Sequence, residues 1–271
     1  MPHPIRILQI SDSHLFVDSK KRLLGLDTEA SFHAVVDLAK AEQAQHDIAL
    51  VLATGDVAQD CSTRAYEYYK KVVEAEFKAP ILWLPGNHDD SKLMTECLKE
   101  CSERVSPCAY DLDKWTIIML DSSVQHEVYG LLKQDQLDYL DRTLSEKTGQ
   151  HVMVCLHHHP ILCGSHWLDG HNLKNAKELW AILHKYPNVK TLVWGHIHQE
   201  FHAVHEVNGH AIQCYAPPST CIQFKPRCYD FALDTLNPGY RWFDLYTNGD
   251  FKTGISRTEQ SFQMDMQSKG Y

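Results

Sequence analysis

The sequence predicts an α/β fold in which βαβ units come first and antiparallel strands follow. Short apolar runs alternate with longer amphipathic segments from residue 6 to about residue 198. After that point, strand and turn signals alternate without a helical pattern. Because no linker, repeat or low-complexity segment divides the 271 residues, we expect one domain over 1–271.

Apolar runs of strand length predict the strands. The run at 48–53 is apolar throughout, which is typical of a parallel strand covered on both faces. Late in the chain, the Asn248-Gly249 pair predicts a two-residue turn between two hairpin strands. The expected strands are 6–10, 48–53, 80–84, 115–120, 151–156, 189–194, 210–216, 241–246 and 250–256.

Apolar residues at helical spacing predict the helices between these strands. In the second helix Tyr66, Tyr69, Val73 and Phe77 share one face, which indicates core packing. The expected helices are 28–45, 62–77, 91–104, 133–147 and 172–186. The polar tail 258–271 is expected to be peripheral and poorly packed.

Five apolar runs each end in metal-binding residue types. Carboxylate oxygens and imidazole nitrogens suit hard or borderline dications, and one carboxylate can bridge two ions. All five ends could emerge at one edge of a sheet, so the sequence predicts a dinuclear metal site there. The five motifs are Asp12-Ser13-His14, Gly55-Asp56, Gly86-Asn87-His88-Asp89, His157-His158-His159 and Gly195-His196-Ile197-His198.

In this order the motifs read D-x-H, G-D, G-N-H-[DE], a lone H and G-H-x-H, and they resemble those of the calcineurin-like metallophosphoesterases. The resemblance covers most of the chain and implies an αββα sandwich, with two mixed β-sheets flanked by helices. It also implies the ligand sets of two metal ions. One ion takes Asp12, His14, Asp56 and His198, and the other takes Asp56, Asn87, His157 and His196.

The same resemblance implies that His88 is not a metal ligand. It implies instead that His88 stabilises the transition state and protonates the leaving oxygen. The implied substrate-binding residues are His14, Asp56, Asn87, His88 and His198. In the triple histidine, the first position after the strand is the ligand. His158 is expected behind the ligands or beside the substrate, and His159 in a structural or solvent-facing place. Gly86 and Gly195 are expected to allow close backbone approach or a positive φ.

Four stretches carry a narrower resemblance, to the bacterial class III 3′,5′-cyclic-AMP phosphodiesterases. They are residues 8–16, 55–60, 165–171 and 218–226. This resemblance implies hydrolysis of cyclic AMP to 5′-AMP by a metal-bridging hydroxide. It leaves open whether Trp167 and Phe224 sandwich the purine or cap the core. The ions are expected to be Fe or Mn, with Zn also compatible with the ligands.

Composition limits the partners. A net charge of −9 speaks against nucleic acid and membrane surfaces, so a small cyclic nucleotide is the expected partner. Two dications with Asp12, Asp56 and a hydroxide leave a formal charge of about +1, which suits a phosphodiester monoanion. Nine cysteines without paired spacing, and a start without an apolar leader, indicate free thiols in the cytoplasm.

Two other functions stay open at this stage. One is a broader phosphodiesterase or nucleotide phosphohydrolase, and the other is a protein-interaction scaffold that has lost its metal ligands. The complete ligand set argues against the scaffold. Gln59 stands where Ser/Thr phosphatases of this family carry an acid, which argues against protein phosphatase activity. The oligomeric state is not indicated.

Overall fold

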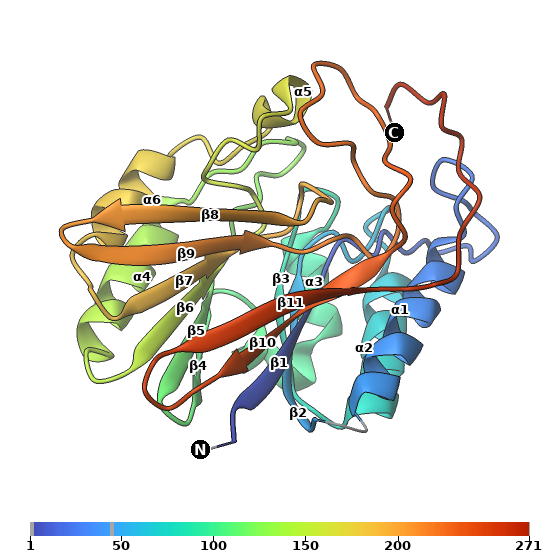
Figure 1. Cartoon of the computed structure of the whole chain (residues 1–271). Helices are drawn as coiled ribbons and strands as arrows, with labels where there is room; N and C mark the ends of the chain where they lie inside the picture. Colours follow the sequence, from blue (N-terminus) through green and yellow to red (C-terminus); the bar gives the residue numbers. More distant parts are fainter. Residues whose placement is uncertain (1–2, 44–45, 271) are drawn as a thin grey trace.

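Two mixed β-sheets lie face to face between layers of helices, as the sequence predicts (Figure 1). The computed structural model describes residues 3–43 and 46–270. In Figure 1, α1 and α2 cover one side of the sandwich, and α4 and α6 cover the other. The αββα arrangement is therefore confirmed.

The first sheet has five strands in the order β11-β10-β1-β2-β3. The three early strands are parallel, as βαβ units require, and the last two add antiparallel. The predicted hairpin of the two late strands is present, but its loop has three residues, Thr247, Asn248 and Gly249, because Gly249 N donates to Tyr246 O and Tyr246 N donates to Asp250 O. The bounds are β1 (Ile5–Ile10), β2 (Ile48–Thr54), β3 (Ile81–Leu84), β10 (Gly239–Leu245) and β11 (Phe251–Arg257).

The second sheet has six strands in the order β4-β5-β6-β7-β9-β8. Two of them were not predicted, β4 and β8. Residues in β8 alternate between half-buried and exposed, so this edge strand has no apolar run. The late part is also not wholly antiparallel, because β9 pairs parallel with β7. The bounds are β4 (Cys108–Leu112), β5 (Trp115–Met119), β6 (His151–Cys155), β7 (Val189–Val193), β8 (Phe201–Val207) and β9 (His210–Ala216).

The helices follow the predicted order with two corrections, and the short helix α5 was not predicted. The segment 91–104 is not one helix, because the α-helix ends at Leu98 (φ −102°, ψ 22°) and a 3₁₀ helix follows, itself kinked at Cys101 (φ −136°). The segment 172–175 is not helical, since Leu173 N donates to His159 O and the Asn175 side chain bonds both backbone groups of Leu132. The elements are α1 (Thr28–Gln43), α2 (Thr63–Phe77), α3 (Ser91–Cys97), η1 (Lys99–Arg104), α4 (Gln134–Glu146), α5 (His166–Asp169) and α6 (Ala176–Leu183). Residues 44 and 45 of the first predicted helix lie outside the described residues.

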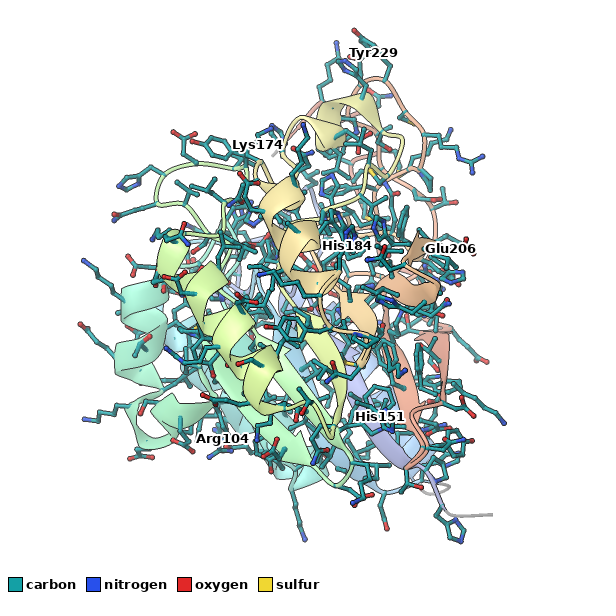
Figure 2. The ribbon with its side chains drawn as sticks, turned by 90° about the vertical axis from the view of Figure 1, so that its left-hand side faces the viewer. Arg104, His151, Lys174, His184, Glu206 and Tyr229 are labelled. Atoms are coloured by element: carbon teal, nitrogen blue, oxygen red, sulfur yellow. The ribbon has the colours of Figure 1, made fainter. Side chains whose placement is uncertain are left out.

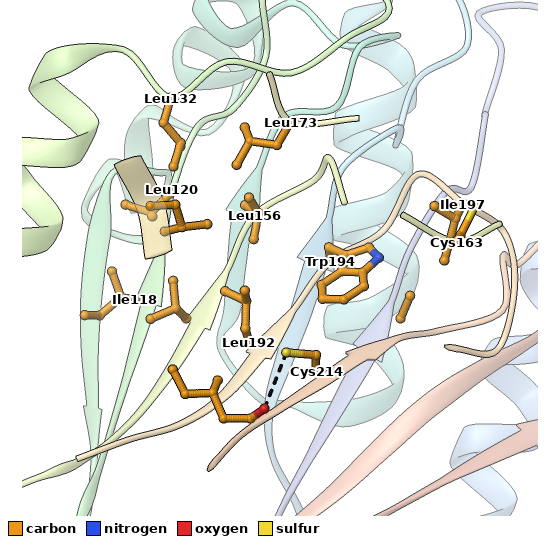
Figure 3. Packing of buried hydrophobic residues seen from close by; sticks show 14 of the residues in the cluster. Ile118, Leu120, Leu132, Leu156, Cys163, Leu173, Leu192, Trp194, Ile197 and Cys214 are labelled. Carbon is orange, nitrogen blue, oxygen red and sulfur yellow. Dashed lines mark hydrogen bonds between the residues drawn. The ribbon is translucent and has the colours of Figure 1, made fainter. Parts of the chain in front are cut away.

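Three apolar clusters fill the spaces between the four layers. Alternate residues of both sheets, such as Leu52 and Met153, meet in the cluster between the sheets. Tyr66 and Tyr69 pack against the first sheet, as their helical stripe predicts. The cluster under α4 and α6 includes Trp194 (Figure 3). Apolar burial on both faces explains why the central strands are continuous apolar runs.

The carboxyl ends of the parallel strands share one end of the sandwich. Tyr229 lies at that end, and Arg104 and His151 lie at the opposite one (Figure 2). The tail runs along residues 22–26, where Asp265 N donates to Leu24 O and Met264 packs half-buried against the core. None of the helices in the described part of the chain has the length and apolar character needed to cross a bilayer.

Removal of a core side chain should lower the free energy of unfolding far more than removal of an exposed one. Leu140 on α4 is fully buried, so Leu140→Ala should cost about 2–5 kcal/mol. Leu162 is 61% exposed, so the matched Leu162→Ala variant should change stability by less than about 0.5 kcal/mol. Urea denaturation measures both, and equal losses would contradict the assignment of this core.

Candidate metal centre

The seven predicted ligands converge at the carboxyl ends of the strands. Four of them, Asp12, His14, Asp56 and His198, place ligand atoms within 4.8 Å of one another. His157 and His196 form a neighbouring group, with ring centroids 5.1 Å apart. All six of these side chains are buried. The seventh, Asn87, has a buried side-chain oxygen at the same loop cluster.

The first group shows two imidazole lone pairs pointing at each other. Nδ1 of His14 lies 2.5 Å from the Gln59 side-chain oxygen, and Nδ1 of His198 lies 2.9 Å from Ile222 O. Both oxygens accept hydrogen bonds, so each ring carries its proton on Nδ1. The two Nε2 atoms are then unprotonated, yet they lie only 3.1 Å apart. A cation beside both nitrogens removes this repulsion.

The second group also places polar atoms together. Nδ1 of His157 lies 2.8 Å from Thr54 O, and its Nε2 faces Oδ2 of Asp56 at 3.3 Å. Among the described residues, Nε2 of His196, Oδ1 of Asn87 and Oδ2 of Asp12 are buried without a hydrogen-bond partner. Buried polar atoms rarely lack partners, so three of them near the two groups indicate a missing ligand of positive charge. The donor set therefore fits metal ions.

Asp56 lies between the two groups. Its Oδ1 accepts a hydrogen bond of 2.9 Å from His88 N. Its Oδ2 lies 3.7 Å from Nε2 of His14 and 3.3 Å from Nε2 of His157. One oxygen thus faces both groups, which is the position that a bridging ligand needs.

The backbone at the ligands is held in an uncommon conformation. Left-handed backbone costs about 1–3 kcal/mol at a non-glycine residue and clusters at functional sites. Gly86 meets the expectation of close approach, because an added Cβ would lie 2.1 Å from Oδ1 of Asp56. At Gly195 it would lie 2.5 Å from the Ser11 hydroxyl. The left-handed ligands are Asp12 (φ 57°), His14 (46°), Asp56 (49°), His196 (66°) and His198 (46°).

Asp89 supports the loops that carry the ligands. Its carboxylate accepts backbone hydrogen bonds from Val57, Ala58 and Gly86. Burial, followed by the nearby Asp56 charge, raises the pKa of Asp89 to about 7. The nearby carboxylate of Asp60 accepts a hydrogen bond from Val17 N. The carboxylates of Asp89 and Asp60 are thus engaged with backbone groups of the loops.

The electrostatics differ between the two groups. Burial lowers the pKa of His14 to about 3, so this ring is neutral at pH 7 and ready to bind a cation. Burial also acts to lower the pKa of His157, but the Asp56 carboxylate outweighs it and raises this pKa to about 9. A metal ion at His157 must therefore displace a proton.

The other histidines of the motifs have separate places. His158 is buried, with Nδ1 2.9 Å from the Ser122 hydroxyl and Nε2 3.2 Å from Val128 O. Both of its nitrogens are used, so it lies behind the ligands. His159 is fully buried, which rules out the solvent-facing alternative. His88 is half-buried, and its ring lies edge-on to His14 at a centroid distance of 5.0 Å.

Several supporting residues were missed by sequence reasoning. Gln59, the partner of His14, could have been noticed in the sequence, because it stands where Ser/Thr phosphatases of the family carry an acid. The backbone oxygens of Thr54 and Ile222 could not have been found from the sequence, since any residue type supplies a carbonyl. Phe224 stacks on His198 at 4.2 Å and 9°. With Trp167 it belongs to a cluster of edge-to-face rings, which favours the capping role over the purine sandwich.

Comparison with protein families gives a match over residues 5–200 to the calcineurin-like phosphoesterases. The chain belongs to this family. The phosphoesterase is also 41% identical to the 3′,5′-cyclic adenosine monophosphate phosphodiesterase CpdA of Escherichia coli (strain K12), over 98% of this chain and 95% of that protein. It is 36% identical to a 3′,5′-cyclic-nucleotide phosphodiesterase of Nostoc sp., over 97% and 96% of the two chains.

Solved structures confirm the fold of the phosphoesterase. A dimetal phosphatase from Danio rerio superposes with a TM-score of 0.65 at 13% identity, covering 98% of this chain and all of that one. A purple acid phosphatase from yellow lupin gives the same TM-score at 12% identity, covering 96% of this chain and 52% of that one. The family implies a dinuclear metal site, and the buried His/Asp cluster is where this chain can hold it.

Substitution of Asp56 should weaken both metal sites, whereas substitution of Asn87 should weaken mainly one. Asp56→Asn keeps the shape but removes the charge that faces both groups. Asn87→Ala removes one uncharged oxygen donor at the second group. Elemental analysis of the purified variants gives the number of ions per chain. Two tightly held ions with normal turnover in Asp56→Asn would contradict the bridging position.

Proposed function

We propose that this phosphoesterase hydrolyses 3′,5′-cyclic AMP to 5′-AMP at a dinuclear metal centre. The observation that carries this proposal is the cluster of buried imidazole nitrogens and carboxylate oxygens around Asp56. The substrate is inferred from the relatives, because proteins named as cyclic-AMP phosphodiesterases are 41% identical over nearly the whole chain. A scaffold without chemistry would not need this complete set.

The proposed ligand sets follow the two groups. Asp12, His14, Asp56 and His198 hold one ion, and Asp56, Asn87, His157 and His196 hold the other. Oxygen and nitrogen ligands without a thiolate suit Fe or Mn, and also admit Zn. When bound, the ions would acidify a water molecule between them and polarise the phosphate oxygens.

The protein side chains position the phosphate and supply a proton to the leaving group. His14, Asp56, Asn87 and His198 border the phosphate, together with His88. The backbone N–H of His88 donates to Asp56, which fixes the start of its side chain next to the centre. Opening the cyclic ester expels the ribose 3′-oxygen, which is strongly basic and needs a proton. We infer that the His88 imidazole supplies it.

A cytoplasmic setting is part of the proposal. All nine cysteines are free thiols in the structure, including Cys97 and Cys101. Free thiols in this number suit a reducing compartment. Cyclic nucleotide is the one partner that we propose.

The charge of the centre should make the enzyme prefer diesters to monoesters. A formal charge of about +1 matches a cyclic monoanion, whereas a monoester dianion resembles the product and should be held as an inhibitor. We expect cyclic AMP to be turned over and 5′-AMP to inhibit competitively. Formation of 5′-AMP from cyclic AMP and release of inorganic phosphate from 5′-AMP, each followed with pure enzyme, measure this. Rapid dephosphorylation of 5′-AMP would favour the broader phosphohydrolase instead.

Replacement of His88 should depend on the leaving group. His88→Ala should cost roughly 10²–10⁴ in turnover of cyclic AMP, where the leaving oxygen needs a proton. The loss should be smaller with bis(p-nitrophenyl) phosphate, because nitrophenolate leaves without much help. Metal content should stay at the parental value, since His88 is not a proposed ligand.

His202→Ala is the matched control, because His202 is exposed on β8 and bonds Gln213. It should leave turnover of both substrates unchanged. Equal losses on the two substrates in His88→Ala, with metals retained, would leave His88 as an electrostatic group only. Loss of an ion would mean that His88 is itself a ligand.

A further inference from the structure

A cavity of about 230 Å³ opens beside the second metal group. Gly86 and Asn87 line it next to the proposed ligands. One wall is the loop 121–126, and the other is the first turn of α3. Cys61 lies at its edge, where its thiol donates to His88 O. The cavity therefore adjoins both the proposed ligand Asn87 and the proposed acid His88.

The two walls are tied together. Oδ2 of Asp121 accepts a hydrogen bond of 3.0 Å from the Ser91 hydroxyl on α3. Oδ1 of the same residue accepts from the backbone N–H and the hydroxyl of Ser123. Asp90 caps α3 by accepting from Leu93 N. A cavity with such walls is preformed, as binding sites for small molecules usually are.

The charge of the cavity suits an uncharged polar group. Its three acids, Asp89, Asp90 and Asp121, all accept hydrogen bonds from the protein. Lys92 and Lys133 take part in no ion pair within residues 3–43 and 46–270, and they balance most of this negative charge. A second phosphate group would gain little binding energy in this cavity. An uncharged nucleoside fits, because the only charge of its nucleotide lies on the phosphate at the metal centre.

The other side of the centre offers no open ring face at Phe224. One face of Phe224 stacks on His198, and the rings of Trp167 and Phe231 lie edge-to-face with it. Phe224 is only 2% exposed. A purine cannot stack on this ring without displacing the residue that supports a proposed ligand.

We propose that the cavity between loop 121–126 and α3 binds the nucleoside of the substrate while its phosphate lies at the metals. Gln125 is exposed on the rim of this cavity, and its amide offers a donor and an acceptor that match the edge of adenine. The ligand class is a purine nucleoside with a single phosphate. This inference rests on the proposed function.

Two accessible cysteines test the location without turnover. Cys61 reports on the cavity. Half-buried Cys228 reports on the side of the centre near Trp167 and Phe224, because its backbone oxygen accepts a hydrogen bond from the N–H of His166, the residue before Trp167. We expect 5′-AMP to slow the alkylation of Cys61 in the metal-loaded enzyme, and inorganic phosphate to slow it much less. Alkylation of Cys228 should not change. Mass spectrometry of peptides from N-ethylmaleimide time courses measures each rate.

Kinetics of Gln125→Ala give the second measurement. Loss of a hydrogen bond should raise KM for cyclic AMP roughly three- to tenfold with a smaller change in kcat. The increase in KM should be larger for cyclic AMP than for bis(p-nitrophenyl) phosphate, which has no purine. Gln260→Ala, an exposed glutamine in the tail, is the matched control and should leave KM unchanged.

The contrary results are distinct. Protection of Cys228 instead of Cys61, protection of neither, or equal protection by phosphate and 5′-AMP would overturn the cavity assignment. An unchanged KM in Gln125→Ala would remove Gln125 from it. Failure of the parent enzyme to hydrolyse cyclic AMP would instead contradict the proposed function, and it is seen in a separate assay.

Discussion

The structure depends on a buried carboxylate, Asp56, set between two groups of imidazole rings. Burying an ionised carboxylate is costly unless charge or hydrogen bonds compensate it. Here one oxygen takes the His88 N–H, and the other faces the Nε2 atoms of His14 and His157. His14 and His198 carry their protons on the far side, so lone pairs crowd around the same point. Positive charge at this point, such as the proposed metal ions would supply, compensates this arrangement.

The rest of the molecule holds that arrangement in place. Two sheets deliver the ligands from different strands to one end of the sandwich, and the apolar clusters on both faces of each sheet make that end rigid. Five of the proposed ligands have left-handed backbone. Hydrogen bonds such as those from three backbone N–H groups to the Asp89 carboxylate hold the loops that carry several of them.

Sequence reasoning found what depends on local pattern. The parallel strands are apolar because both faces are covered, and each proposed ligand motif follows such a run, so the strands and the convergence of these side chains could be predicted together. It failed where the pattern is weak or the partner is distant. Edge strand β8 alternates half-buried and exposed positions, so it shows no apolar run. Thr54 and Ile222 act through carbonyls that carry no side-chain signal, and Phe224 acts through a stack on a ring 26 positions earlier in the chain.

The central claim is that the buried cluster holds two ions that share Asp56. Anomalous diffraction from crystals of the enzyme loaded with Mn tests it most directly. The account predicts two peaks roughly 3.5–4 Å apart, one beside Asp12, His14 and His198 and the other beside Asn87, His157 and His196, with Asp56 in contact with both. A single peak, or a second ion away from Asp56, would contradict the claim.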